Sequence, residues 1–223
     1  LKYDSYIDFI YKNIIRYFPS SFLENYKEYI VELQSFSSQY KTISMYSHFN
    51  DDYFKINEDE LMEYFHYSGF SGKLKLRFKF VKTWILHSMA YSSPLANWII
   101  SFQRMRGVKI GKNCHFSPYV QIDLLYPDQI TIEDNVSIGT NCIIFAHANM
   151  PTNMKLKNNA YPRKINPVII KSGAIIGPGT IITAGVTIGK NALTAVGSVV
   201  TQDVPDSCVA AGNPARVIKK IDE

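Results

Sequence analysis

The second half of the chain repeats a six-residue pattern of hydrophobic and polar positions. Between Ile170 and Pro205 a branched aliphatic residue opens five of six successive hexads, and the fifth position is always small or β-branched. A period of six fits neither a helix nor simple strand alternation, and it is typical of a parallel β-helix. The same rule holds upstream for the hexads that begin at Ile110, Phe116, Ile132 and Ile138.

The hexads predict a triangular coil in which each side is one short strand and a corner. The first residue of a hexad points inward, and the fifth points inward near the corner. Glycines such as Gly139 and Gly177 relieve crowding where the backbone bends. Each coil buries its apolar interior only by stacking on the next coil. An antiparallel sandwich is the alternative, but its strands need period-two alternation, which ten matching hexads argue against.

The first half of the chain, residues 1 to about 105, predicts helices instead. Its apolar residues recur at helical spacing and its breaks fall at helix-capping signals. We expect helices over residues 4–18, from Ser21 to about Phe36, from Asn57 to near Gly69, and from the Ser93-Pro94 pair to about Met105.

The segment KLKLRFKFVK, which begins at Lys73, alternates basic and apolar residues as a strand would. Because Leu74, Phe78, Val81 and Ile85 also line one helical face, periodicity alone leaves both structures open. We favour a helix, since no partner strand is apparent. A basic amphipathic helix can bind a membrane surface. We favour the alternative, in which the apolar face packs on neighbouring elements of the protein.

Two irregular segments interrupt the hexads. The longer covers about residues 146–167 and is rich in Asn, Pro and Lys, as loops are. The shorter, DLLYPDQ, covers residues 123–129 and delays the register. Loops that break a regular scaffold are usually where function resides.

Composition narrows the class of protein. The chain has 223 residues, of which 13% are aromatic, so it is a folded protein. No apolar run could span a bilayer, and the start, LKYDSYIDF, lacks the form of a signal peptide. Three cysteines without metal spacing favour reduced thiols and a cytoplasmic location. The net charge of +5 suits an anionic cofactor or substrate without requiring nucleic acid.

The stretch from Gly107 to Ile221 resembles the hexapeptide-repeat acyltransferases. The resemblance rests on TIEDNVSIGTNCIIFAH before the long loop and on VTIGKNALTAVGSVVTQDVPDSCVAAGNPARVIKKI at the end. It implies a mainly β fold, with a left-handed parallel β-helix over residues 106–223 that ends in a C-terminal tail. The helical spacing described above predicts an α-helical region over residues 1–105 before it. The resemblance also implies a homotrimer with active sites between subunits and acetyl-coenzyme A as the acetyl donor.

The resemblance also assigns roles to residues. His147, at the start of the long loop, matches the family's general base, which removes the acceptor's proton. Asp123 lies one coil earlier and is a candidate to orient that histidine, although a turn aspartate that caps its own bend is the alternative. Asn149 and Tyr161 are candidates for acceptor binding. We expect no metal, because only His147 is suitably placed.

For the cofactor, the matched positions are Gly185, Val196, Thr201, Arg216 and Lys219. Cationic side chains suit the phosphates of coenzyme A, although tail lysines could simply keep a surface segment solvated. Four basic residues of the loop could bind an anionic acceptor or only keep the loop soluble; they are Lys155, Lys157, Arg163 and Lys164.

Two positions depart from the family pattern. Gln202 stands where many relatives have lysine, which weakens one phosphate contact. Pro178 stands where relatives offer a backbone N–H to the thioester oxygen, and proline has none. The N–H of Gly177 or Gly179 would then have to replace it.

Together these features predict an acetyl-coenzyme A-dependent O-acetyltransferase of a sugar hydroxyl, acting in surface polysaccharide or glycoconjugate synthesis. One alternative is an amino-sugar N-acetyltransferase. An alternative of another class is a β-helix binding or scaffold protein without catalysis.

Overall fold

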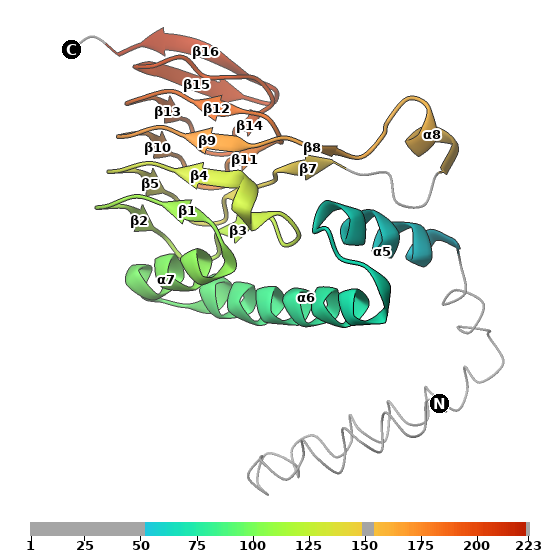
Figure 1. Ribbon diagram of the computed structural model, residues 1–223. Helices are drawn as coiled ribbons and strands as arrows, with labels where there is room; N and C mark the ends of the chain where they lie inside the picture. The colour runs from blue at the N-terminus through green and yellow to red at the C-terminus, as the bar shows by residue number, and fades with distance from the viewer. Residues whose placement is uncertain (1–51, 149–153, 222–223) are drawn as a thin grey trace, which may run out of the picture. The chain divides into compact units, whose positions relative to one another are not determined.

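The computed structural model describes residues 52–148 and 154–221, and element labels follow Figure 1. Lys55–Glu223 form one compact unit, which contains the coil and the helices directly before it. The helices predicted over 4–18 and from Ser21 to about Phe36 lie outside the described residues. The division of the chain into two domains near residue 105 stays a prediction.

Short parallel strands form the three faces of a coil, and each turn adds one strand to each face (Figure 1). The first face contains β1 (Lys109–Ile110), β4 (Ile130–Ile132), β9 (Val168–Ile170) and β12 (Thr187–Ile188). The second contains β2 (His115–Phe116), β5 (Ser137–Ile138), β10 (Ile175–Ile176), β13 (Leu193–Thr194) and β15 (Cys208–Gly212). The third contains β3 (Gln121–Ile122), β6 (Ile143–Ile144), β11 (Ile181–Ile182) and β14 (Val199–Val200). Strand β16 (Ala215–Lys220) pairs antiparallel with β15 at the far end.

The interior of the coil is filled by the residues that the hexads predicted. First-position residues such as Ile138 and Ile182 are at most 1% exposed, and fifth-position Cys142 and Thr180 are fully buried. The predicted crowding at the second position is also present, since a Cβ on Gly139 would lie 2.5 Å from the nitrogen of Pro178. The hexad pattern is therefore confirmed as the pattern of the core.

The fourth position adopts a left-handed backbone conformation in nine of the ten hexads, which the sequence pattern did not predict. Asn141 has a φ of 58° and Gly185 a φ of 86°. Asparagine and glycine enter this region at the least cost, which explains why they recur just before the buried fifth residue. The same conformation occurs at Asn113, Tyr119, Asn135, Gly173, Gly179, Asn191 and Gly197.

The described helices before the coil are α5 (Asp52–Tyr64), α6 (Gly69–Ser92) and α7 (Ala96–Arg106). Helix α5 ends earlier than predicted because His66 takes a positive φ of 52°, which breaks the helical path. Helix α6 confirms the helical prediction for the segment that begins at Lys73. Helix α7 contacts β1 and β2, and in Figure 1 it lies against the first turn of the coil.

The predicted start of α7 at Ser93-Pro94 was wrong by two residues. Ser93 instead ends α6, and its Oγ accepts a hydrogen bond of 3.3 Å from the backbone N–H of Leu95. The helix then begins at Ala96 and ends at Arg106, where Gly107 has a φ of 109°. Glycine tolerates this left-handed conformation and so closes the helix.

The predicted packing face of α6 was also wrong. The four predicted packing residues are exposed instead, Leu74 by 47%, Phe78 by 67%, Val81 by 49% and Ile85 by 45%. The opposite side of the helix is buried instead, through Gly72, Leu76, Thr83, Leu86 and Ala90. Small residues on that side let the helix approach its neighbours closely.

The long loop leaves the coil after β6 as a hairpin. Strand β7 (His147–Ala148) pairs antiparallel with β8 (Lys164–Ile165), and the short helix α8 (Met154–Asn158) lies between them in the chain. The shorter interruption folds into a 3₁₀ turn, η2 (Pro127–Gln129), before β4. In Figure 1 the hairpin and α8 project from the side of the coil. Both interruptions therefore begin at the same corner, after strands of the third face.

Candidate active site

Asp123 and His147 meet at the corner that follows the third face of the coil. The backbone N–H of Asp123 donates to the carbonyl of Ile144 at 2.9 Å, which stacks the end of β3 under the end of β6. The chain then continues from Ile144 into the hairpin, and His147 is the first residue of β7. The parallel ladder thus places Asp123 one turn before His147 at the same corner.

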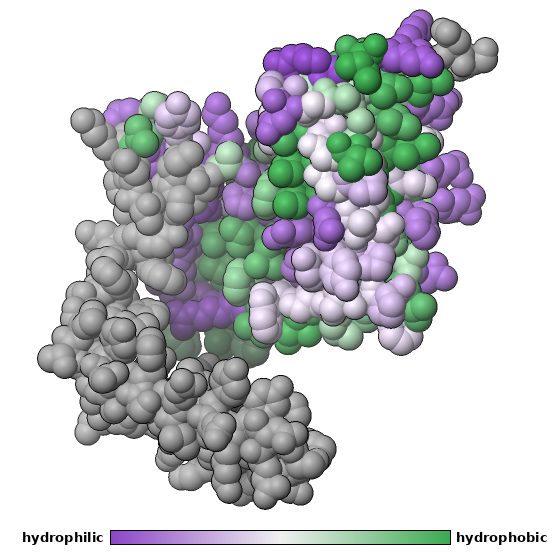
Figure 2. All heavy atoms as spheres, turned by 180° about the vertical axis from the view of Figure 1, so that it is seen from behind, coloured by the Kyte–Doolittle hydropathy of each residue, from purple (hydrophilic) through white to green (hydrophobic). Residues whose placement is uncertain are grey.

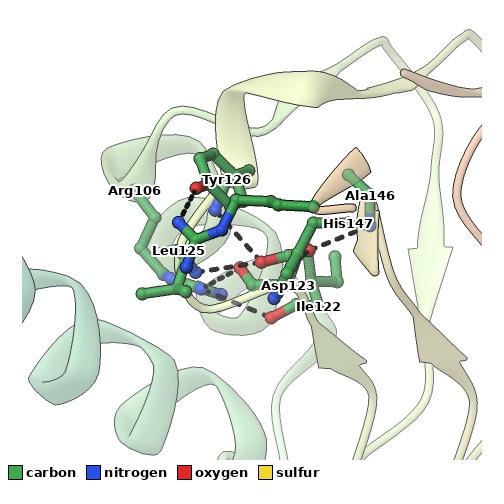
Figure 3. Close-up of polar contacts among 8 residues, drawn as sticks. Arg106, Ile122, Asp123, Leu125, Tyr126, Ala146 and His147 are labelled. Carbon is green, nitrogen blue, oxygen red and sulfur yellow. Dashed lines mark hydrogen bonds and ion pairs between the residues drawn. The ribbon is translucent and has the colours of Figure 1, made fainter. Parts of the chain in front are cut away.

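Figure 3 shows the Asp123 carboxylate enclosed by hydrogen-bond donors. Oδ1 accepts the backbone N–H groups of Leu125 at 2.9 Å and Tyr126 at 3.0 Å. Oδ2 accepts the N–H of Ala146 at 2.9 Å and lies 2.5 Å from Nδ1 of His147. The Asp123 side chain is fully buried, whereas 20% of the His147 side chain is exposed. The protein therefore encloses the carboxylate of Asp123, whereas the imidazole of His147 is partly open to solvent.

This arrangement fixes the charge of Asp123 and the tautomer of His147. Both carboxylate oxygens accept hydrogen bonds, so the group has no position for a proton of its own. Burial acts to raise the pKa of Asp123, but the hydrogen bond and charge of His147, with the N–H groups of Tyr126 and Ala146, lower it overall. Nδ1 of His147 must then carry a hydrogen, which leaves Nε2 as the proton acceptor when the ring is neutral.

Arg106 forms hydrogen bonds to the backbone at the corner that carries Asp123. This mostly buried guanidinium donates from Nη2 to the carbonyl of Asp123 at 2.6 Å and from Nη1 to Oε1 of Gln103 at 2.5 Å. Burial lowers its pKa to about 10, although the charge of Asp123 opposes the shift, so Arg106 stays protonated at neutral pH. Nη1 also lies 3.0 Å from Nδ1 of His87. The sequence offered no sign of this role, because Arg106 lies at the end of a helix.

Tyr126 contacts the ring of His147, and Arg163 in turn contacts Tyr126. The buried Tyr126 ring meets the imidazole edge to face at a centroid distance of 5.1 Å. Arg163 donates from Nη1 to the Tyr126 hydroxyl at 2.9 Å and pairs through Nε with Glu60 at 3.0 Å. Glu60 also pairs with Lys157 at 2.6 Å. We call Glu60, Lys157 and Arg163 the clamp, because they tie α5 to the hairpin and α8.

The clamp changes the interpretation of the basic loop residues. The side chains of Lys157 and Arg163 are only 5% and 10% exposed, so they do not serve as open anion-binding groups in the described chain. Lys164 is exposed on β8. The side chain of Lys155 lies outside the described residues.

Of the two predicted acceptor-binding residues, only Tyr161 lies within the described residues, and no contact between it and the Asp123–His147 pair, which we call the dyad, is present there. Asn149 lies outside the described residues. Tyr161 follows α8, is 56% exposed and has its N–H bonded to the carbonyl of Leu156 at 2.7 Å. Across residues 52–148 and 154–221, no three His, Cys, Asp or Glu side chains gather closely enough to hold a metal ion.

The five predicted cofactor residues lie on more than one corner. Gly185 lies near the base of the hairpin, since a Cβ there would approach Asn166, whose N–H bonds to the carbonyl of Ala146. Thr201 follows β14 at the corner of the dyad. Val196 follows β13 at a different corner and is 75% exposed. The remaining two, Arg216 and Lys219, are exposed on β16.

The two backbone groups proposed to replace Pro178 are already used. The N–H of Gly177 donates to the carbonyl of Thr194 at 2.9 Å, and that of Gly179 donates to the carbonyl of Thr140 at 2.8 Å. Both bonds belong to the ladder between turns of the coil. The expectation that either group is available to a thioester oxygen is therefore wrong for the single chain.

Comparison with known proteins gives relatives of one kind. No family model matches the chain. The YvoF protein of Bacillus subtilis (strain 168), provisionally named an acetyltransferase, is 34% identical over 144 residues, which are 63% of this chain and 77% of that protein. The galactoside O-acetyltransferase of Escherichia coli (strain K12) is 34% identical over 126 residues, which are 56% of this chain and only 59% of the enzyme.

A solved structure extends the likeness to three dimensions. A galactoside acetyltransferase in complex with coenzyme A superposes with a TM-score of 0.53 and 28% identity, over 66% of this chain and 82% of that one. The likeness confirms the predicted fold class, a left-handed parallel β-helix of hexapeptide repeats preceded by helices.

Proposed function

Because the chain belongs to the hexapeptide-repeat acetyltransferases, we propose that it transfers the acetyl group of acetyl-coenzyme A to a sugar hydroxyl, with His147 as general base. The similar galactoside enzymes support the sugar acceptor, and the coenzyme A complex of one of them supports the donor. A role in surface polysaccharide or glycoconjugate synthesis stays a prediction from the sequence.

The Asp123–His147 pair is the observation that carries this proposal. The short bond to a fully buried carboxylate holds Nδ1 as a donor, so Nε2 is the basic nitrogen. A hydroxyl group is a poor nucleophile at neutral pH, and removal of its proton during attack is what a neutral imidazole can supply. The ionised Asp123 then stabilises the imidazolium that forms, as the aspartate of a Ser-His-Asp triad does.

The proposed reaction proceeds by direct transfer. Nε2 of His147 accepts the proton of the acceptor hydroxyl while the oxygen attacks the thioester carbonyl. The carbon–sulfur bond then breaks, and the leaving thiolate takes the proton back from Nε2. No acyl group is held on the protein, so catalysis depends on holding acceptor and thioester together.

We propose that the cofactor site is completed between subunits of a homotrimer. Gly185 and Thr201 share the corner of the dyad, but Val196 lies on another corner and cannot meet His147 of the same chain. A neighbouring subunit that presents its Val196 corner to the dyad would bring both sets together. Arg216 and Lys219 would then offer cations to the phosphates of coenzyme A.

Exposed apolar side chains on the coil support this packing. Ile175 is 48% exposed and Val196 is 75% exposed. Figure 2, which views the coil from behind, shows apolar residues between polar ones over its upper turns. Exposed apolar area of this kind is usually covered by a partner.

The test is the release of free thiol from acetyl-coenzyme A with a panel of sugars and amino sugars. We expect release that requires a hydroxyl sugar and falls at least about 10³-fold in His147→Ala. His115→Ala is the matched control, because His115 is an exposed histidine on β2, on another face of the coil. The control should keep the wild-type rate.

The other outcomes select other functions. Release only with amines would move the assignment to an N-acetyltransferase. A His147→Ala rate close to wild type would remove His147 as the base. If no acceptor reacts and coenzyme A does not bind in a titration, the chain is a binding or scaffold protein and the proposal fails.

A further inference from the structure

Helix α6 is apolar on two opposite sides. One side packs against the protein through residues such as Leu76, Leu86 and Ala90. The other, which we call the outer face of α6, carries six large apolar side chains that are 45–85% exposed, from Met89 at 45% to Phe70 at 85%. Their spacing of three or four residues places them on one line along the helix. The outer face consists of Phe70, Leu74, Phe78, Val81, Ile85 and Met89.

A surface helix of a soluble protein normally has a single apolar stripe, which faces the core. A second stripe along almost the whole of a 24-residue helix is therefore a surface that needs a partner. In Figure 1 α6 lies below the coil, so one side faces the coil and the other faces away. Trp84 and Trp98 add to the exposed apolar area, at 54% and 57%.

The charges along α6 identify the kind of partner. Helix α6 contains Lys and Arg but no Asp or Glu, and α7 contains two Arg and likewise no Asp or Glu. Exposed Lys75 and Lys82 run along one side of the outer face, with Lys73 and Arg77 along the other side. The last two also approach Glu58 on α5, at 3.1 and 3.5 Å. An apolar line between rows of cations is the pattern of helices that lie in a membrane interface.

We propose that the outer face of α6 docks on an anionic lipid bilayer. The apolar side chains would enter the boundary between headgroups and acyl chains, while the lysines reach the lipid phosphates. Exposed tryptophans favour the same depth, since one end of the ring is apolar and the other polar. Docking is peripheral, because no helix of the described residues is long and apolar enough to cross a membrane.

A second copy of the chain fits this face less well. If two outer faces packed together, the rows of lysines on each would face those on the other, and like charges across an interface are unfavourable. An anionic bilayer meets the apolar line and the cations at once. This argument rests on α6 and does not depend on the acceptor or on the role of His147.

The experiment is cosedimentation of the full chain with vesicles of phosphatidylcholine alone and of phosphatidylcholine mixed with phosphatidylserine. We expect binding to the mixed vesicles that weakens as salt is raised. The double variant Phe78→Glu/Val81→Glu should lower the bound-to-free ratio at least about tenfold, and Lys75→Gln/Lys82→Gln should lower it less.

The matched control is Val217→Glu/Ile218→Glu, which adds the same two charges to exposed positions on β16. The control should bind as wild type does. Equal binding to both kinds of vesicle, or equal binding by the Phe78→Glu/Val81→Glu variant, would overturn the proposal.

Two further readouts identify other partners of the same face. A smaller mass in solution for Phe78→Glu/Val81→Glu than for wild type would show an interface between copies. An unfolding temperature far below that of the control would show that the protein itself covers the face. Either result would overturn the lipid assignment, and thiol release measured without vesicles would still test the proposed function separately.

Discussion

Asp123 and His147 meet at one corner, but two different kinds of structure hold them there. Asp123 belongs to the coil, where its backbone joins a ladder that repeats at every turn. His147 belongs to the hairpin, whose far side is tied down by the clamp of Glu60, Lys157 and Arg163. A regular scaffold fixes one partner, and a few specific side chains fix the other.

The difference predicts what each region contributes when it is altered. Removing a buried side chain from the coil should lower stability, because many turns share the apolar interior. Loosening the clamp should lower activity as well as stability, because His147 can lose its orientation while the coil stays folded. Asp123 lies where the two regions join, so its loss should affect both.

Asp123→Asn should have the largest effect. An amide cannot accept all four hydrogen bonds that the carboxylate accepts, so one donor at the corner is left buried and unpaired. We expect a loss of about 2–4 kcal/mol in the free energy of unfolding and a fall in kcat of about 10³-fold or more. Urea unfolding and thiol release measure the two effects.

The control for this substitution is Asp134→Asn. Asp134 also accepts a backbone N–H, from Lys112 at 2.6 Å, but it is exposed at another corner of the coil. It should leave kcat unchanged. If Asp123→Asn kept kcat within about tenfold of wild type, orientation of His147 by the carboxylate would be ruled out as a main contribution.

Ile138→Ala tests the coil alone. Ile138 is 1% exposed and fills the interior on β5, away from the corner of the dyad. We expect a loss of about 2–5 kcal/mol in the free energy of unfolding, with kcat of the folded enzyme close to wild type. Ser137→Ala, one residue earlier and partly exposed, should cost less than about 0.5 kcal/mol. Comparable losses for both variants would contradict the assignment of inward and outward positions.

These two regions also mark how far the sequence could predict the structure. The hexads identified inward residues such as Ile138 and Cys142, because one turn of the coil imposes the same requirement as the next. They also put Asp123 one turn before His147. The clamp has no such period: Arg163 bonds to Asn57, a residue 106 positions away. Contacts of this kind arise from tertiary packing, so no local pattern points to them.

The faces of α6 show a second limit. Apolar residues at helical spacing correctly predicted that this segment is a helix, but they predicted the wrong packing face, because the helix has two apolar sides. The small residues Gly72 and Ala90 decided which side is buried, since they allow close approach of the helix. Periodicity counts apolar residues and does not weigh their size. The larger side chains, such as Phe78, were therefore assigned to the wrong side.

Glu60→Gln tests the clamp. The change leaves Lys157 and Arg163 largely buried without their carboxylate, which should cost about 1–3 kcal/mol, less than for a fully buried pair because Glu60 is 29% exposed. Arg163 would then hold Tyr126 less firmly against His147, and we expect kcat to fall about tenfold. Thiol release at saturating acceptor separates this fall from a change in KM.

A matched control lies two residues away on the same helix. Glu58 also pairs with two cations, Lys73 and Arg77, but their side chains are 39% and 72% exposed. Glu58→Gln should therefore change stability by less than about 1 kcal/mol and leave kcat unchanged. Equal effects of the two substitutions would show that the clamp holds the hairpin no better than a surface ion pair.

His87→Asn should have the smallest effect, and the effect should appear only in acid. Burial, with the nearby charge of Arg106, lowers the pKa of His87 from 6.5 to about 4. Between these values the unfolded chain binds more protons at this position than the folded chain does. Stability is therefore lost as pH falls from 6.5 towards 4, and this part of the loss is absent above pH 6.5.

Asparagine at position 87 cannot titrate, yet its amide oxygen can accept the hydrogen bond that Nη1 of Arg106 directs at Nδ1. The free energy of unfolding of His87→Asn should therefore fall less steeply between pH 6.5 and 4 than that of wild type. Helix propensity changes by the same amount at every pH, so the comparison of slopes removes it. His115→Asn, on the exposed side of β2, should keep the wild-type slope. If His87→Asn also kept the wild-type slope, protonation of His87 would not be what weakens the protein in acid. The guanidinium of Arg106 would then tolerate a second positive charge beside it.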